Sequence, residues 1–440
     1  MKSCFKLLSI ILFSSITTLV FAQATSSDSL SLNDAIRMTL TNQPLIQQAI
    51  EQVNSIDAKV KEQKSSYYPV INAIGSYNRI GPVPSINFPG QGLFKLYPEN
   101  NYDAHLSVNH DLYDFGRREA EVNIAESYKT SAVDNVQLLK TNLAFATIQT
   151  YYSILFLEKS IAVTDTDIAT LSHHIDLTNK KIESGTATEY DLLSTKVRIA
   201  DYQSKKNDLL NELNKQYINL SHLTGQPAGE NLKLMGKFLS VISEINVDSL
   251  TETAYKQRPE MQLAKDEERT ARLKENVSKL GYLPIVGLHL SYGIKNGYIP
   301  NLDVLRGNWV AGVEVKVPVF NGFRTKNQEE EAKANRRSTE TGLLNLKQQI
   351  KSEVEKAASD VNSNLKQIKI ANDLVGLAKK SLLKAKAQYA SGVGTNLDLL
   401  DAETRLADAE FLYLRSVYLN IIYSYNLKEA VGEIVFNNYQ

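Results

Sequence analysis

The sequence lacks much of what enzymes and nucleic-acid-binding proteins depend on. It has a single cysteine, Cys4, among 440 residues, which excludes a disulfide framework, a cysteine-type zinc site and thiol catalysis in the rest of the chain. It has no charge surplus either, with 49 basic and 49 acidic residues. A polyanion binder needs basic residues to displace counterions, so nucleic acid is an unlikely partner class. Hydrophobic residues make up 43%, which argues against wholesale disorder.

Long apolar runs are also scarce after the first residues of the chain. Lys2 and Lys6 precede an apolar stretch at 7–20 that ends in residues typical of a signal-peptidase site. We expect 1–22 to be a cleaved secretory signal peptide, because the stretch is short for a membrane anchor. Cys4 lies inside it. Since no later segment has the pattern of a transmembrane helix, entry into a membrane would require strands.

Proline is absent from the two stretches where long helices are expected, and glycine is absent from much of the first. No proline occurs at 99–226 or after 318, and no glycine occurs between Gly116 and Gly185. Proline breaks helix interiors, so these stretches can form uninterrupted helices. A helix filling the glycine-free stretch would be about 100 Å long at 1.5 Å per residue. Within the two proline-free stretches, apolar residues recur at spacings of three and four, at 210–220 and at 399–413, which favours coiled-coil packing. An ordinary helical bundle fits this spacing equally well, but it does not fit the length.

The sequence contains an internal duplication. Residues 181–203 match residues 388–410 at an offset of 207, with nine identities in 23 positions. Upstream the offset is 215, as Pro44 and Pro259 show, so the first copy has eight extra residues. We expect a loop at 81–100 to contain them.

This duplication predicts the domain organisation. The first repeat is expected at 23–225 and the second at 248–432. An equatorial inter-repeat segment at 226–247 and a C-terminal tail at 433–440 fit neither copy. The predicted strands are 69–80, 101–114, 285–297 and 308–320, and the turns of the helix pairs are expected near 185–191 and 392–398.

The four predicted strands alternate apolar and polar residues. Their length of about ten residues and their alternation are typical of tilted transmembrane strands. A half-buried sheet in a soluble domain has the same pattern, but helices of this length leave little core to cover it. Four strands cannot close a barrel, and open edges are not tolerated in lipid. The barrel must then be shared, with eight strands from two chains or twelve from three.

With this plan, the chain resembles the TolC family of outer-membrane efflux and secretion channel proteins over about 31–432. The resemblance depends on the duplicated strand-strand-helix plan, the DFGR and NGFR junctions at 114–117 and 321–324, and the turns GTATEYDLL and GVGTNLDLL. It implies a fold of coiled-coil helical barrel plus transmembrane β-barrel, closed as a homotrimer with twelve strands. It also implies outer-membrane lipid, a periplasmic adaptor (membrane fusion) protein and an inner-membrane pump as partners. It implies a passive channel that extends into the periplasm, not an enzyme, with no cofactor, metal or nucleic acid.

The resemblance also assigns residues to the periplasmic entrance. It places the gate tyrosine at Tyr389, an aspartate that holds the closed state at Asp191, and two ring aspartates at Asp398 and Asp401. The family's closing arginine corresponds to Gly394, so the closing Arg–Asp bond is missing. Three chains would then present a ring of six carboxylates, which favours cations. Ordinary helix-capping or solvated aspartates are the alternative.

The two turns are expected to receive the adaptor. Gly185 and Gly392 allow positive φ where the chain reverses. Thr188 and Thr395 can cap the helices that follow.

Three functions remain open at this point. The first is the outer-membrane exit duct of a tripartite efflux system, passing small molecules from the periplasm and an inner-membrane pump to the exterior. The second is an outer-membrane outlet for type I protein secretion, which only a neighbouring transporter gene would distinguish. The third is a periplasmic coiled-coil scaffold without a channel, against which the alternating strands argue.

Overall fold

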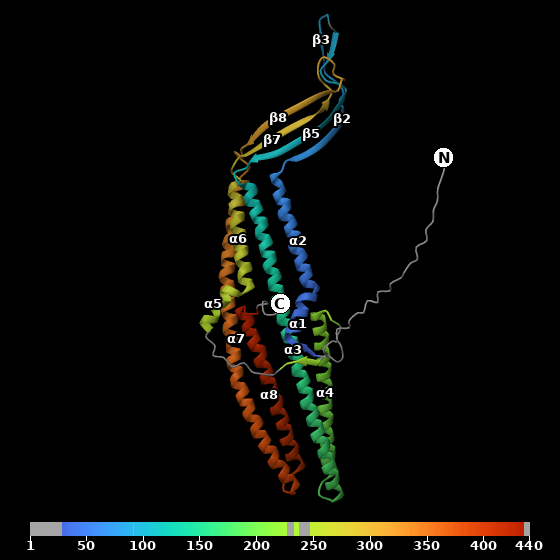
Figure 1. Ribbon diagram of the computed structural model, residues 1–440, viewed down its shortest axis with the longest axis vertical. Coiled ribbons are helices and arrows are strands. Elements are labelled where there is room, and N and C mark those ends of the chain that lie inside the picture. The colour runs from blue at the N-terminus through green and yellow to red at the C-terminus, as the bar shows by residue number, and fades with distance from the viewer. Residues whose placement is uncertain (1–28, 91, 227–232, 237–246, 435–440) are drawn as a thin grey trace, which may run out of the picture.

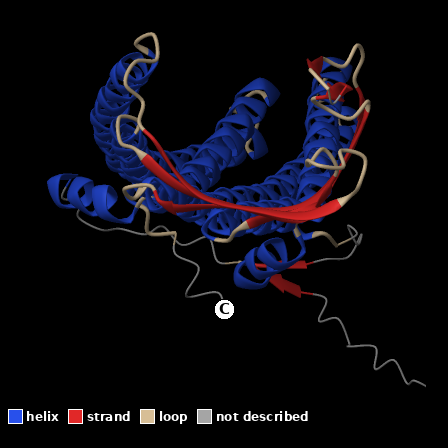
Figure 2. Ribbon diagram, turned by 90° about the horizontal axis from the view of Figure 1, so that it is seen from above, coloured by secondary structure: helices blue, strands red, loops and turns tan. Residues whose placement is uncertain are grey.

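The chain is long and thin, with a β-sheet at one end and two helical hairpins at the other (Figure 1). The computed structural model describes residues 29–90, 92–226, 233–236 and 247–434. The predicted signal peptide, 1–22, therefore lies outside the described residues. Seen along its length, the helices form an arc that follows the curve of the sheet (Figure 2).

The element order repeats the same plan twice. The first half contains β1 (Ser29–Ser31), α1 (Leu32–Asn42), α2 (Pro44–Lys64), a 3-10 turn (Ser65–Tyr67), β2 (Val70–Arg79), β3 (Ser85–Phe88), β4 (Gly92–Lys95), β5 (Asn100–Tyr113), α3 (Arg117–Glu183) and α4 (Glu189–Thr224). The second contains β6 (Lys233–Met235), α5 (Val247–Gln257), α6 (Pro259–Leu280), β7 (Ile285–Lys295), β8 (Arg306–Lys316), α7 (Arg324–Ala390) and α8 (Asn396–Val431).

The long helices occupy the stretches without proline. α3 and α7 each have 67 residues, and α4 and α8 each have 36. At 1.5 Å per residue, α3 and α7 are each about 100 Å long. Among the described helices, none combines the length and the apolar composition that a membrane span requires.

The two repeats are joined by one antiparallel sheet. Its order is β2–β5–β7–β8, so the central pair β5–β7 is the seam between the repeats. Within this four-stranded sheet, β2 and β8 are the edge strands, and each has a neighbour on one side alone in the described chain. The outer edges of both strands therefore keep backbone donors and acceptors that need a partner.

The extra residues of the first repeat differ from the expected loop. β3 and β4 pair in an antiparallel hairpin, with Ile86 opposite Phe94. Gly90 and Gly92 have φ of +85° and +84°, which gives the chain the freedom to reverse there. This hairpin could not be predicted from alternation because its strands have only four residues each. It projects beyond the end of the sheet (Figure 1).

The apolar core lies at mid-height, where short elements cover the long helices. β1 and β6 pair in parallel beside α1, on the convex side of the arc (Figure 2). Tyr151 of α3 is fully buried beneath them, with its hydroxyl 2.8 Å from the carbonyl oxygen of Leu30 and 2.6 Å from that of Met235. Burial raises the pKa of Tyr151 to about 12. In the second repeat, α5 covers α7 through Ala254, which packs with Ile350.

Candidate functional site

The strand register places apolar side chains on one face of the sheet. Leu288 of β7 lies opposite Val313 of β8, and Tyr292 lies opposite Trp309. The same face continues across the sheet through Ile71, Ala73, Leu106, Val108 and Leu290. Trp309 is 74% exposed and Val313 is 64% exposed. The isolated chain therefore leaves a continuous apolar surface without a covering layer.

The opposite face of the sheet is mainly polar, although Val70, Ile74 and Val310 also lie on it. It carries Asn72, Ser76, Asp103, His105, Ser107, Asn109, His289, Ser291, Asn308 and Glu314. An apolar outer face and a polar inner face are what a water-filled membrane barrel requires.

Two tight junctions turn the strands into the long helices. In the first, Phe115 and Gly116 have φ of +57° and +85°, and the Asp114 carboxylate accepts hydrogen bonds from the backbone of Gly116 and Arg118. Arg118 also pairs with Asp114 at 2.8 Å. The second junction repeats the geometry with positive φ at 322 and 323. Both predicted junction motifs therefore fix the direction of a helix relative to the sheet.

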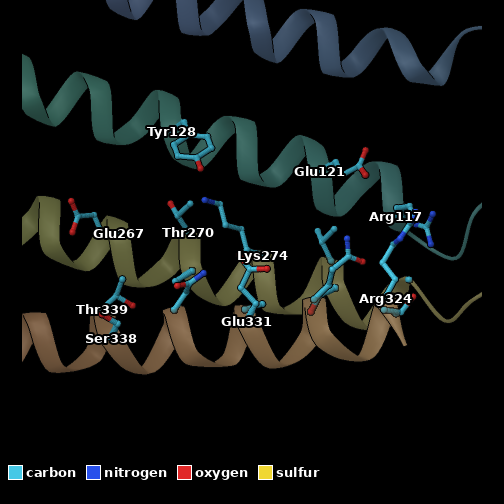
Figure 3. Close-up of a pocket in the computed structure, with 18 of the residues that line it drawn as sticks. Arg117, Glu121, Tyr128, Glu267, Thr270, Lys274, Arg324, Glu331, Ser338 and Thr339 are labelled. Carbon is cyan, nitrogen blue, oxygen red and sulfur yellow. The ribbon is translucent and has the colours of Figure 1, made fainter. Parts of the chain in front are cut away.

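The helices nearest the sheet present a polar groove on the concave side. The groove has a volume of about 1030 Å³ and lies between α3, α6 and α7 (Figure 3). Tyr128 lines it, whereas Ile148, twenty residues further along α3, packs against α1. Twenty residues are about 5.6 turns, so the two side chains lie on opposite sides of α3. Since α1 is on the convex side, the groove opens toward the inside of the arc (Figure 2).

Opposite charges balance along this groove. Its basic residues are Arg117, Lys274 and Arg324, and its acidic residues are Glu121, Glu267 and Glu331 (Figure 3). The described residues contain no group of three or more histidine, cysteine or acidic side chains arranged for a metal ion. The charged side chains of both signs are spread along the groove, whereas those of a dedicated ligand site point toward one position.

A buried acidic pair lies between α3 and α6. Asp266 is only 4% exposed, its Oδ2 has no hydrogen-bond partner among the described residues, and the half-buried Asp134 of α3 is its acidic neighbour. Burial, together with Asp134, raises the pKa of Asp266 to about 6. The folded state therefore holds a proton here that the unfolded chain releases near pH 3.8. This contribution to stability is complete below about pH 3.8 and is lost as the pH rises through 6.

At neutral pH the folded state bears the free-energy cost of ionising Asp266 in a buried position. Replacing Asp266 by asparagine should remove this cost. We expect Asp266→Asn to raise the free energy of unfolding at pH 7.5 by about 1–2 kcal/mol, because the amide can donate to Asp134. The gain should shrink at pH 4.5. Thermal unfolding at both pH values measures it, with Asp360→Asn on the exposed surface of α7 as the control. An equal gain in the free energy of unfolding at both pH values would mean that ionisation of Asp266 is not its cause.

Both hairpin turns are closed by the residues predicted to cap them. Gly185 and Gly392 have φ of +73° and +77°. Thr188 then caps α4 in a capping box with Asp191, and the backbone N–H of Thr188 donates to Asp191 Oδ2 at 2.9 Å. The predicted helix caps are confirmed, and Asp191, which the family resemblance assigns to the entrance, has a local structural role in one of them.

The second turn has the same chemistry. Thr395 caps α8, and its N–H and Oγ1 donate to Asp398 Oδ2 at 2.9 and 2.6 Å. These hydrogen bonds hold the pKa of Asp398 below its usual value. Asp401 lies one turn further on, largely exposed, and pairs with Arg405 at 2.8 Å. Both predicted ring aspartates therefore have partners within their own helix.

The hairpins of the two repeats touch near these turns. Lys181 of α3 lies 3.8 Å from the centroid of the Tyr389 ring and donates to the Tyr389 carbonyl oxygen. Tyr389 is 5% exposed, and its hydroxyl has no hydrogen-bond partner among the described residues. His174 Nε2 lies 2.6 Å from Asn396 Oδ1, and Asn396 donates to the Asp191 carbonyl oxygen.

The sequence analysis did not single out Lys181, His174 or Asn396 as functional. A signal was present, because Asp167, His174 and Lys181 recur at intervals of seven on α3. Residues at this interval share one stripe of a coiled-coil helix. Ionisable residues repeated along such a stripe indicate polar contacts with another helix. The pattern does not identify that helix.

Gly394 sits where a side chain has little room. Its N–H donates to the Gln388 carbonyl oxygen at 3.0 Å. An added Cβ would lie 3.0 Å from the Gln388 Cβ and 3.2 Å from the Tyr389 nitrogen. A side chain here would require a small shift of Gln388; the matching turn of the first repeat accommodates Ala187, whose N–H donates to the Lys181 carbonyl oxygen at 3.2 Å.

An antiparallel sheet with one apolar face, joined to single helices about 100 Å long that end in helical hairpins, defines an outer-membrane channel protein with a periplasmic extension. The chain belongs to the outer membrane efflux protein family, whose profile it matches over residues 35–226 and 250–433. It is therefore an outer-membrane efflux protein of the TolC type. This family is one of channels rather than enzymes.

Relatives and solved structures agree with this assignment. The outer membrane protein TolC of Vibrio cholerae is 21% identical over 402 residues, which cover 89% of this chain and 88% of the relative. The alkaline protease secretion protein AprF of Pseudomonas aeruginosa is 22% identical over 427 residues, covering 93% and 87%. The structure of CusC has a TM-score of 0.79 at 17% identity, covering 91% of this chain and 92% of that one. The structure of VceC from Vibrio cholerae has a TM-score of 0.77 at 17% identity, covering 91% and 96%.

These likenesses confirm the predicted fold class of long coiled-coil helices with a small β-part in two tandem repeats. They also confirm the predicted location in the outer membrane with extension into the periplasm.

Proposed function

We propose that three copies of this chain close into a twelve-stranded barrel and that the assembly is the passive exit duct of a tripartite efflux system. The observation that carries the proposal is the sheet itself. It has a continuous apolar face and two unpaired edges, β2 and β8. Pairing β2 of one chain with β8 of the next satisfies both edges and leaves the apolar face toward lipid.

The helical hairpins would then form a tunnel through the periplasm. Its inner surface is the polar groove around Tyr128, which suits a hydrated path for small molecules. A periplasmic adaptor would meet the turns at Gly185, Thr188, Gly392 and Thr395. An inner-membrane pump would supply the energy, since the duct itself is passive.

One observation favours a second candidate. AprF, by its name a protein of alkaline protease secretion, matches this chain over nearly its full length. The alternative function of the same channel is therefore to be the outer-membrane outlet of type I protein secretion.

The contacts between the hairpins support a gate at the entrance. We infer that Tyr389 and Asp191 belong to it, held by Lys181 and His174 rather than by an arginine at 394. Asp398 and Asp401 would form the carboxylate ring of the opening.

The first test is the native mass of the protein extracted by detergent from the outer-membrane fraction. A trimer that requires detergent is expected. A monomer released without detergent would rule out the shared barrel. Transport of small molecules or of a secreted polypeptide by cells that carry the duct with its neighbouring transporter would then separate the two clients.

The carboxylate ring makes a prediction about ion selectivity. Asp398→Asn with Asp401→Asn removes the charge while retaining an oxygen that can accept the Thr395 hydrogen bonds. We expect the double variant to lose cation selectivity, measured as a shift of the reversal potential toward zero in planar bilayers under a salt gradient. Asp360→Asn with Asp373→Asn removes the same charge from the exposed surface of α7 and is the matched control. If the double variant and its control had equal reversal potentials, Asp398 and Asp401 would not determine the selectivity of the opening.

A further inference from the structure

The two hairpins of one chain meet along a strip in which apolar contact is sparse. α3 and α4 contribute Leu171 and Tyr202 to it, and α8 contributes Leu400 and Ala407. Beside this small cluster is a cavity of about 220 Å³ that is lined from both hairpins. Nearer the sheet, α3 and α8 are held by the Phe156 ring, which stacks on Tyr418 at 4.6 Å. At the strip itself little apolar surface is buried, so the polar groups around the cavity contribute to how firmly this end of the contact is held.

Two carboxyl groups from opposite hairpins line this cavity, Asp167 of α3 and Glu403 of α8. Both are half-buried. Glu403 Oε2 has no hydrogen-bond partner among the described residues. Like charges across a partly buried contact repel strongly when both groups are ionised.

The surrounding charges come from all four helices. Asp167 faces Glu403, Asp408 and Glu410 of α8 and Lys205 of α4, and Glu403 faces His174 of α3 and Lys386 of α7. Arg198 of α4 also lines the cavity. Glu410 is ion-paired with Lys379 at 3.1 Å, and Lys205 lies over the Phe411 ring. Lys205 is thus partly engaged elsewhere, whereas Arg198 and Lys386 line the cavity beside the two carboxyl groups.

We propose that this strip is a pH-sensitive latch, which holds the α3–α4 and α7–α8 hairpins together when Asp167 and Glu403 are protonated and loosens when they ionise. The latch rests on the proposed channel function, since it would control how readily the periplasmic entrance opens.

The pKa values of both carboxyl groups are shifted upward, as the latch requires. Burial, with Glu410, raises the pKa of Asp167 to about 6, and burial raises the pKa of Glu403 against the opposing effect of His174. A raised carboxyl pKa stabilises the packed state fully below the ordinary value near 3.8. That stabilisation is lost as the pH rises through 6. The entrance is therefore tighter in an acidified periplasm.

Distances between the hairpins test the latch directly. Spin labels at Gln203→Cys in α4 and Lys384→Cys in α7, both exposed, report on one chain when it is diluted with unlabelled protein. Double electron–electron resonance on the full-length, detergent-solubilised protein compares pH 5 with pH 8. We expect a shift to longer and broader distances at pH 8. In Asp167→Asn with Glu403→Gln, the short distance should persist at both pH values.

Asp266→Asn is the matched control, because it removes a carboxyl of raised pKa that lies outside the strip. It should keep the full pH-dependent shift. A wild-type distance that does not change, or an unaltered shift in the double variant, would overturn the latch. Because the readout is a distance in purified protein, absence of transport in cells would count against the proposed function and leave the latch standing.

Discussion

Val313→Lys is expected to abolish assembly of the protein in the outer membrane. Val313 lies on the apolar face of β8, opposite Leu288, and is 64% exposed in the single chain. A lysine facing lipid near the midplane costs about 2–4 kcal/mol, and a trimer would contain three. The measurement is the amount of trimer recovered in the outer-membrane fraction.

The neighbouring residue provides the control. Glu314 lies on the polar face, opposite Gly287. Glu314→Lys introduces the same side chain one residue away and should assemble at close to the wild-type level. Normal assembly of Val313→Lys would mean that this face does not contact lipid.

Gly293→Val should have a comparable effect for a different reason. A Cβ at Gly293 of β7 would lie 2.2 Å from the Ala104 carbonyl oxygen and 2.4 Å from the His105 Cβ of β5. The carbonyl oxygen belongs to the backbone of the strand that joins the two repeats, so it cannot move without disturbing the ladder. We expect a loss of about 3 kcal/mol or more, measured as reduced resistance of the trimer to protease and heat.

Another glycine on the same polar face separates crowding from strand propensity. Gly312 of β8 has nothing within 4 Å of an added Cβ. Gly312→Val should therefore be tolerated. If both variants were equally impaired, close packing of β5 against β7 would not be the cause.

Local sequence rules predicted much of this fold. The stretch without proline or glycine located α3, and the stretch without proline after 318 located α7, because an unbroken helix needs little else locally. Alternation located the sheet strands, and the threonines before Asp191 and Asp398 located the caps. All of these features depend on residues close together in the chain.

Pairing between distant segments could not be predicted in the same way. His174 and Asn396 are 222 residues apart, and nothing local connects them. The β1–β6 ladder over Tyr151 is similar, because each strand has only three residues. The roles of Asp398 and Asp401 also depended on the structure, which shows local partners that compete with any role in a channel.

The matched helix lengths of the two repeats restrict how this protein can evolve. α3 and α7 have 67 residues each, and α4 and α8 have 36 each. One inserted residue would lengthen a helix by about 1.5 Å and rotate everything beyond it by about 100°. An insertion in a single hairpin would move its turn out of the plane of the other and its packing stripe off its neighbour. Viable length changes must therefore arise in both arms of a hairpin, in both repeats, and in steps that restore the heptad.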